Sequence, residues 1–205
     1  MYKAFGKRLC DVILGLIALV LLSPVMLVCI IIIKCEDKGP AFFTQKRIGI
    51  GKQTFSMYKF RSMKMNTPHD TPTHLLANPE QYLLRCGKFM RKYSLDELPQ
   101  IVNIIKGDMS VVGPRPALWN QYDLIAERDK YGANDIRPGL TGWAQINGRD
   151  ELEIHEKARL DGEYVRREGF AFDVMCIWRT AFKAARHEGV VEGGTGTKHG
   201  NDTAC

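Results

Sequence analysis

The sequence predicts an α+β protein, in which a small globular domain with amphipathic surface helices follows a long apolar N-terminal segment. Three observations predict this class. Residues 12–33 contain no charged side chain, two β-prone stretches follow them, and helical periodicity dominates the remainder. With 205 residues, the chain has room for one domain with its own core but not for two of ordinary size.

The charge and cysteine content narrow the range of partners and compartments. The formal net charge is +6, which favours nucleic acid, phosphate-rich ligands or the anionic face of a membrane as partners. The six cysteines are scattered and form no C-x-x-C pair. We therefore expect a reduced, cytosol-facing environment, and charge alone does not choose among the anionic partners.

The apolar run would be about 33 Å long as one helix, enough to cross a bilayer. Two features argue against a straight span: Asp11 lies at its start behind Lys7 and Arg8, and Ser23-Pro24 lies in its middle, where proline kinks or breaks a helix. The basic residues keep the N-terminus cytosolic, so a span would export the rest of the chain. A re-entrant helix broken at Ser23-Pro24 avoids export, and the residues leave both topologies open.

The elements of the domain follow from periodicity and turn signals. A hairpin is expected from the β-prone stretches 41–44 and 54–60. Beyond it we expect helices over about 80–92, 94–106, 117–131 and 151–167, a short strand over 109–112, and a glycine-rich loop over 137–149. The expected division is a membrane helix-hairpin over 1–36, a catalytic domain over 37–192 and a flexible tail over 193–205.

The last helix, from about Phe172, carries an apolar stripe that includes Val174, Trp178 and Phe182. Basic residues lie on the opposite side of this helix. Such a stripe packs on a protein core more often than it lies on a membrane surface, so we expect core packing.

The segment Ser94–Gln100 contains the adjacent acids Asp96 and Glu97. Its structural interpretation is a capping box, because Ser94 and Glu97 have the required spacing. Its chemical interpretation is a divided role, in which one carboxylate is a metal ligand and nucleophile and the other handles a proton or orients a reactant. The segment alone leaves both open.

Two further segments supply groups that suit a sugar nucleotide. Arg115 lies between two prolines, which limit the conformations from which its guanidinium meets a phosphate. The block over residues 137–149 combines arginines, amides and glycines. Each segment alone is also compatible with an ordinary surface turn.

Taken in order along the chain, these segments resemble the bacterial sugar transferase family. They are Lys7-Arg8-Leu9-Cys10-Asp11, Ser23-Pro24, Lys59-Phe60-Arg61-Ser62-Met63, the Asp96-Glu97 segment, Gly113-Pro114-Arg115-Pro116 and the block 137–149. The resemblance covers roughly residues 2–190 and is to the minimal form of the monotopic phosphoglycosyl transferases, like the enzyme that starts bacterial N-glycan assembly.

The resemblance implies a role for each matching residue. Asp96 would be the nucleophile and a ligand of Mg²⁺, and Glu97 would position or deprotonate a reactant. The implied substrate-binding residues are Lys59, Arg61, Arg115, Arg137, Gln145 and Arg149, and the implied membrane-anchor residues are Lys7, Arg8, Asp11, Ser23 and Pro24. Asp161 and Tyr164 match a D-x-x-Y element of the family to which we assign no role.

The implied reaction transfers a sugar phosphate from a UDP-sugar, expected to be N-acetylated, to polyprenyl phosphate. The implied location is the cytosolic face of the bacterial inner membrane, with lipid of one leaflet as a partner and no nucleic acid; a homodimer is compatible with the sequence. The alternatives are a membrane-anchored glycosyltransferase, disfavoured because no Asp-x-Asp motif is present, and a basic membrane adaptor, supported by charge alone.

Overall fold

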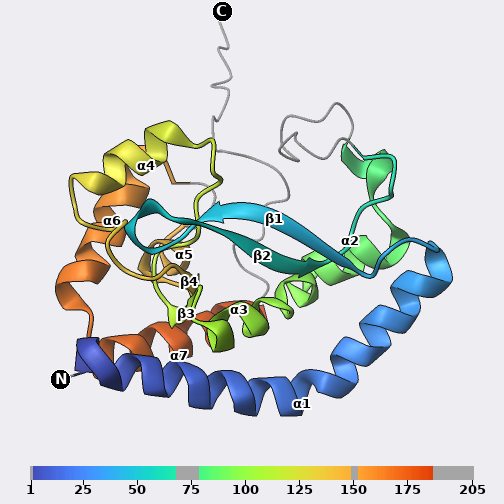
Figure 1. Ribbon diagram of the computed structural model, residues 1–205, viewed down its shortest axis with the longest axis horizontal. Coiled ribbons are helices and arrows are strands. Elements are labelled where there is room, and N and C mark those ends of the chain that lie inside the picture. Colours follow the sequence, from blue (N-terminus) through green and yellow to red (C-terminus); the bar gives the residue numbers. More distant parts are fainter. Residues whose placement is uncertain (1, 68–78, 149–151, 187–205) are drawn as a thin grey trace, which may run out of the picture.

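The computed structural model describes residues 2–67, 79–148 and 152–186, and it is an α+β domain resting on one long helix (Figure 1). The α+β class is confirmed. The elements are η1 (Tyr2–Gly6), α1 (Lys7–Glu36), β1 (Phe42–Ile48), η2 (Ile50–Lys52), β2 (Thr54–Phe60), η4 (Pro79–Tyr82), α2 (Arg85–Lys92), η5 (Leu95–Glu97), α3 (Gln100–Lys106), β3 (Ser110–Val112), α4 (Tyr122–Asp129), β4 (Gly139–Thr141), α5 (Trp143–Ile146), α6 (Ile154–Arg167) and α7 (Phe170–Arg186).

The long helix α1 continues through Pro24. Proline has no N–H to donate to the carbonyl four residues earlier, which belongs to Val20. The hydroxyl of Ser23 donates to that carbonyl instead, at 2.8 Å, so the acceptor stays satisfied. The expected break at Ser23-Pro24 therefore takes the form of a bent single helix rather than two separate helices (Figure 1).

The N-terminal end of α1 is tied into the domain by a buried polar network. The ammonium of Lys7 donates to the Asp173 carboxylate at 2.6 Å and to the Tyr164 hydroxyl at 2.9 Å. The Tyr164 hydroxyl donates to the other Asp173 oxygen at 2.7 Å. Because these groups are buried, each depends on the others for its hydrogen bonds, and together they join α1 to α6 and α7.

Arg8 and Asp11 attach the same end of α1 to α3 and β3. The guanidinium of Arg8 donates to the carbonyls of Ile104 and Ile105, at 2.5 and 2.6 Å, which lie in the last turn of α3. Asp11 accepts a hydrogen bond from the Ser110 hydroxyl at 2.9 Å. The charged residues before the apolar run thus dock the helix onto the domain, and their membrane-anchor role stays a prediction.

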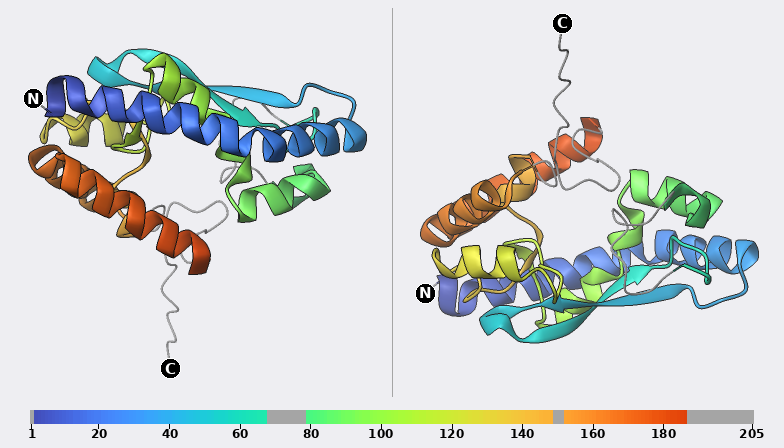
Figure 2. Two further views of the ribbon diagram at one scale, coloured as in Figure 1. Left: turned by 90° about the horizontal axis from the view of Figure 1, so that it is seen from below. Right: turned by 90° about the horizontal axis from the view of Figure 1, so that it is seen from above.

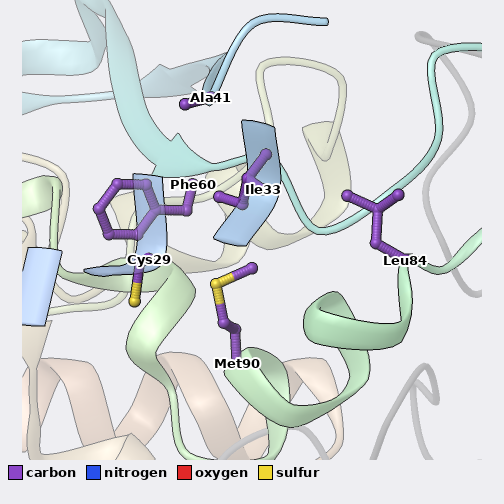
Figure 3. Packing of buried hydrophobic residues seen from close by; sticks show 6 residues of the cluster. All are labelled: Cys29, Ile33, Ala41, Phe60, Leu84 and Met90. Carbon is purple, nitrogen blue, oxygen red and sulfur yellow. The ribbon is translucent and has the colours of Figure 1, made fainter. Parts of the chain in front are cut away.

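The C-terminal part of α1 packs on the same domain through an apolar cluster. The cluster comprises Cys29, Ile33, Ala41, Phe60, Leu84 and Met90. Figure 3 shows these side chains gathered where α1, β2 and α2 meet. Both ends of α1 therefore contact one domain, by polar groups at one end and by apolar groups at the other.

Most of the apolar surface of α1 between these contacts is uncovered. The helix is long and apolar enough to cross a membrane, and only 11% of its most apolar stretch of 18 residues is buried inside the domain. Its exposed large side chains include Ile13, Leu16, Ile17, Val20, Leu21, Leu27, Val28 and Ile31. A surface of this size and character indicates contact with lipid or with a partner.

The described residues form two small sheets. The predicted hairpin is confirmed, because β1 and β2 pair antiparallel from Phe42 opposite Phe60 to Ile48 opposite Thr54. The second sheet pairs β3 with β4 in parallel, with Ser110 opposite Gly139. The expectation of a loop over 137–149 is wrong for the part that forms β4 and α5. A strand of three residues is too short to show alternation, so its pairing with a distant segment left no local signal.

The stripe on α7 does not face the core. Phe170, Val174, Trp178 and Phe182 are 60%, 48%, 72% and 51% exposed, while Phe172 is buried. The expectation of core packing is therefore wrong for Val174, Trp178 and Phe182. Helix α7 lies on the same side of the molecule as α1, the underside of Figure 1, which the left view of Figure 2 shows face on.

Candidate active site

Asp96 and Glu97 lie in η5, a short 3-10 turn between α2 and α3. Leu95 and Leu98 flank the pair and pack against the apolar cluster around Phe60, so the core anchors the turn on both sides. Ser94 precedes the turn with a φ of 54° and makes no side-chain capping bond, so the capping-box interpretation is not supported. A left-handed serine costs about 1 kcal/mol, which the packing of the turn has to offset.

One oxygen of Glu97 holds two cations. Its Oε1 accepts from the Lys59 ammonium at 3.1 Å and from an Arg115 guanidinium nitrogen at 3.0 Å. Lys59 comes from β2 and Arg115 from the loop after β3, and the three side chains are 17%, 27% and 12% exposed for Lys59, Arg115 and Glu97. The fold thus gathers, from three segments distant in the sequence, two cations that suit a phosphate ligand.

Asp96 is almost completely buried beside these groups. Burial raises the pKa of its carboxyl group and the neighbouring Glu97 charge adds to the rise, while Lys59, Arg91 and Arg115 oppose it. Burial likewise lowers the pKa of Lys59, against the attraction of Glu97 and Asp96. Poorly solvated charged groups that face one another in this way are typical of sites that carry out chemistry.

The parallel strand pair fixes the loop that carries Arg115. The N–H of Gly113 donates to the Thr141 carbonyl at 2.8 Å, and the N–H of Gly139 donates to the Pro114 carbonyl at 2.8 Å. A side chain at Gly113 or Gly139 would collide with the backbone of the other segment. The glycines of the segment Arg137–Gly142 therefore serve the close approach of two strands, and this approach sets the position of Arg115.

The other predicted binding residues lie in other surroundings. Arg61 pairs with Asp37 at 3.0 Å and joins the end of β2 to the end of α1. Arg137 donates to the Gly107 carbonyl at 3.0 Å, at the far end of α3 from Glu97. Gln145 donates its amide to a backbone carbonyl within its own segment at 3.0 Å. None of these three bonds joins Arg61, Arg137 or Gln145 to the carboxylate pair, and Arg149 lies outside the described residues.

Arg91 is a residue near the site to which sequence reasoning gave no role. It lies in the last turn of α2, donates to the Ser62 hydroxyl at 2.9 Å and acts electrostatically on Asp96. The basic pair Arg91-Lys92 was visible just before the acidic segment. Neighbouring residues of a helix point in different directions, so only one of Arg91 and Lys92 can point toward Asp96. The helical periodicity of α2 could have identified Arg91 as that residue.

Asp161 and Tyr164, the residues of the D-x-x-Y element, hold helices together. Asp161 accepts two bonds from Arg128, at 2.8 and 2.6 Å, which joins α6 to α4. Tyr164 belongs to the network around Lys7 and Asp173. Both side chains are fully buried, and both hold α6 in place.

A magnesium site would have to rely on few protein ligands. Within residues 2–67, 79–148 and 152–186, no group of three or more His, Cys, Asp or Glu side chains is placed to hold a metal. Mg²⁺ commonly binds through one or two carboxylates, substrate phosphates and water. The carboxylate of Asp96, with Glu97 beside it, fits a metal that arrives with a diphosphate.

Comparison with known proteins shows the family of this chain. The family model described as bacterial sugar transferase matches residues 2–187. The chain belongs to the bacterial sugar transferase family. The resemblance inferred from the sequence motifs and the assignment of the chain to the transferases are both confirmed.

Several relatives within this family have named activities. The chain is 39% identical to a UDP-glucose:undecaprenyl-phosphate glucose-1-phosphate transferase of Xanthomonas campestris pv. campestris, over 89% of this chain and 39% of the relative. It is 38% identical to the uncharacterized sugar transferase EpsL of Bacillus subtilis, over 90% and 89%. It is 37% identical to a UDP-N-acetylgalactosamine-undecaprenyl-phosphate N-acetylgalactosaminephosphotransferase of Aeromonas hydrophila, over 86% and 43%. The sugar transferase therefore spans about two-fifths of the Xanthomonas and Aeromonas proteins and most of the Bacillus one.

Proposed function

We propose that this protein transfers a sugar 1-phosphate from a UDP-sugar to undecaprenyl phosphate and releases UMP. The observation that carries the proposal is the buried Asp96 beside a Glu97 carboxylate that holds Lys59 and Arg115 on one oxygen. The names of the relatives support the donor and acceptor classes. The reaction would be the first membrane step of glycoconjugate assembly, such as a capsule, an exopolysaccharide, an O-antigen or a glycoprotein glycan.

The proposed mechanism has two displacements at phosphorus. A carboxylate oxygen of Asp96 attacks the phosphorus bonded to the sugar, the bond from that phosphorus to the bridging oxygen breaks, and UMP leaves with the bond electrons. The sugar phosphate is then held on Asp96 as an acyl phosphate. An oxygen of undecaprenyl phosphate attacks the same phosphorus, and Asp96 leaves as a carboxylate.

The surrounding residues lower the barrier by balancing charge. Lys59 and Arg115 neutralise phosphate oxygens, which would otherwise repel the Asp96 carboxylate. Glu97, once its cations move to phosphate, is placed to orient the acceptor phosphate or to take a proton from it. Asp96 would help to hold Mg²⁺, which when bound would supply further neutralisation of the phosphate charge.

An apolar groove supports a lipid acceptor. Between α1 and α2 lies a cavity of about 360 Å³ whose lining includes Pro24, Cys29, Phe89 and Leu95. Its exposed lining surface is entirely apolar, and Leu95 precedes Asp96 in the chain. A polyprenyl chain that enters from the lipid beside α1 would bring its phosphate to the carboxylate pair.

The same geometry supports a position in one leaflet at the cytosolic face of the inner membrane. Both ends of α1 contact one domain, whereas the ends of a spanning helix would lie on opposite sides of a hydrocarbon layer about 30 Å thick. A cytosolic domain meets soluble UDP-sugars, and an embedded helix meets the lipid acceptor. Both substrates can therefore reach Asp96.

The first experiment tests the chemistry and the choice of sugar. Purified protein with Mg²⁺ and undecaprenyl phosphate is supplied with a panel of UDP-sugars, and the nucleotide product is identified. UMP is expected, with an N-acetylated sugar the best donor; the relatives include both glucose and N-acetylgalactosamine enzymes. Release of UDP would instead indicate a glycosyltransferase that moves the sugar alone.

The covalent step is tested by intact-protein mass spectrometry without acceptor. The parent protein should gain the mass of one sugar phosphate on Asp96 and release UMP in proportion to enzyme. Asp96→Asn should abolish the adduct and lower turnover by at least a thousandfold, since the amide is not an anionic nucleophile. The control Asp123→Asn changes an exposed carboxylate on α4 and should behave as the parent. Turnover without an adduct, under conditions that require both substrates together, would contradict the two-step mechanism.

A further inference from the structure

Arg47, near the end of β1, connects the hairpin to the loop that carries Arg115. One terminal nitrogen of its guanidinium donates to the Pro116 carbonyl at 3.0 Å, and the other donates to the Gln45 amide oxygen at 2.7 Å. Gln45 lies two residues earlier on the same strand. Gln45 therefore fixes the guanidinium of Arg47 on the strand, and the guanidinium in turn binds the loop at Pro116.

Backbone hydrogen bonding reinforces this connection. The N–H of Ile48 donates to the Ala117 carbonyl at 3.0 Å, and Arg47 forms an isolated antiparallel bridge with Leu118. On the other side of Arg115, Pro114 is bonded to Gly139 of β4. Arg115 is thus the one residue between two fixed points, and the prolines on either side have no N–H with which to add a third.

The hairpin also carries Lys59. Lys59 lies opposite Phe43 in the antiparallel register, and Arg47 follows Phe43 by four residues. Because side chains two and four residues apart share a face of a strand, and directly opposed residues share it too, Arg47 and Lys59 lie on one face of the hairpin. This face of the hairpin therefore carries Lys59 itself, and through Arg47 it also fixes the position of the loop that bears Arg115.

We infer that Arg47 is a positioning residue for the donor diphosphate, which sets Arg115 at the distance from Lys59 at which both cations reach one phosphate group. The convergence of both cations on one oxygen of Glu97 is the arrangement that it maintains. Arginine suits the task because its rigid fork bonds two acceptors at once, which a lysine ammonium on a flexible stem does less well. The inference rests on the proposed function, since it names a determinant of donor binding.

The experiment compares Michaelis constants for the two substrates in Arg47→Gln. The donor KM should rise about tenfold, while the KM for undecaprenyl phosphate stays within twofold, because the acceptor groove between α1 and α2 does not include Arg47. Arg47→Lys should restore part of the donor affinity. The control Lys52→Gln removes a positive charge from the same hairpin, where Lys52 forms an exposed pair with Asp129, and should leave both constants unchanged.

A double-mutant cycle adds a second readout. If Arg47 acts through Arg115, then Arg47→Gln should raise the donor KM much less in an Arg115→Lys background than in the parent. Should Arg47→Gln fail to fold, Gln45→Ala removes one acceptor of the guanidinium and should give a smaller but equally donor-selective effect. Equal rises in both Michaelis constants, or multiplicative effects in the cycle, would overturn the inference. A parent protein that releases no UMP would instead refute the proposed function.

Discussion

In the proposed mechanism, Glu97 occupies the place that an oxygen of the donor phosphate would take. Its Oε1 receives bonds from both Lys59 and Arg115, and all three side chains are largely withdrawn from solvent. A donor phosphate bound by Lys59 and Arg115 would therefore have to replace a carboxylate that already pairs with both cations. On this proposal, substrate binding would exchange one ion partner for another, and the donor affinity would depend on how strongly Glu97 binds Lys59 and Arg115.

This competition predicts opposite effects of Glu97→Gln on binding and on turnover. The neutral amide holds the cations less strongly, so UDP-sugar should bind about three- to tenfold more tightly. Turnover should fall at least a hundredfold, because the amide can neither take a proton nor orient the acceptor as an anion does. Calorimetric titration with UDP-sugar and steady-state UMP release measure the two effects.

The matched control for this variant is Glu127→Gln, which neutralises another ion-paired carboxylate. Glu127 pairs with Lys130 at 2.6 Å on α4. Neither donor affinity nor turnover should change in this variant. Weaker donor binding in Glu97→Gln would mean that the carboxylate organises the cations for phosphate rather than competing with it.

At the residue scale, sequence motifs predicted several of the side chains that lie together at the candidate site, but other predicted residues lie elsewhere. The acidic pair, Lys59 and Arg115 were all identified from short motifs, and the fold brings them together. Arg61 shares a motif with Lys59, but β2 ends at Phe60 and the next residue turns away to pair with Asp37. The residue at which a strand ends depends on packing between distant segments, and a short sequence motif carries no information about that packing.

At the scale of elements, local patterns identified the hairpin and most helices, whereas the pairing of distant short segments was missed. Strands β1 and β2 each have seven residues and adjoin one short turn. Strands β3 and β4 have three residues each and meet through a parallel pairing across a long connection. The contact depends on glycines that let two backbones approach, and their role in the sequence alone is indistinguishable from turn chemistry.

Helix α7 was predicted to be amphipathic, but which of its faces is buried depended on the tertiary structure. Its exposed aromatic and aliphatic residues recur every fourth position. The helix itself lies on the side of the molecule that bears α1 (Figure 2). Basic side chains at Arg179 and Lys183 lie along the same helix. This composition suits the boundary between lipid headgroups and acyl chains.

The position of α7 predicts that Trp178 contacts lipid. In vesicles made with brominated phospholipids, which quench tryptophan fluorescence at short range, Trp178→Phe should remove most of the quenchable signal. Trp119→Phe is the matched control, because Trp119 is 45% exposed but lies beside Lys46 of β1. A quenchable signal that is unchanged in Trp178→Phe would place Trp178 and its face of α7 outside the membrane.

At the scale of the whole molecule, α1 is held at both ends by one domain. The N-terminal contact is a buried polar network with Asp173, and the C-terminal contact is the apolar cluster around Phe60. The apolar composition of α1 was evident from the sequence, but composition does not distinguish a span from a re-entrant helix. The docking of both ends of α1 supports the proposed re-entrant topology, and the residues of the domain that dock them are scattered along the chain.

This arrangement predicts that the residues before α1 and the domain after α1 face one side of the membrane. In a cysteine-free background, Lys3→Cys and Lys130→Cys place thiols at exposed positions before α1 and just after α4. An impermeant maleimide should label neither in intact cells and both after permeabilisation. Labelling of only one of them in intact cells would show that α1 crosses the bilayer.

The bend of α1 has a mechanical consequence for the bilayer. Because the Ser23 hydroxyl satisfies the Val20 carbonyl within the helix, the bend needs no water and no neighbouring chain inside the lipid. A helix that enters and leaves through one face occupies area in that leaflet and none in the other. If α1 lies in one leaflet as proposed, each inserted molecule would expand that leaflet against its neighbour, and insertion would be coupled to the lateral pressure and curvature of the membrane.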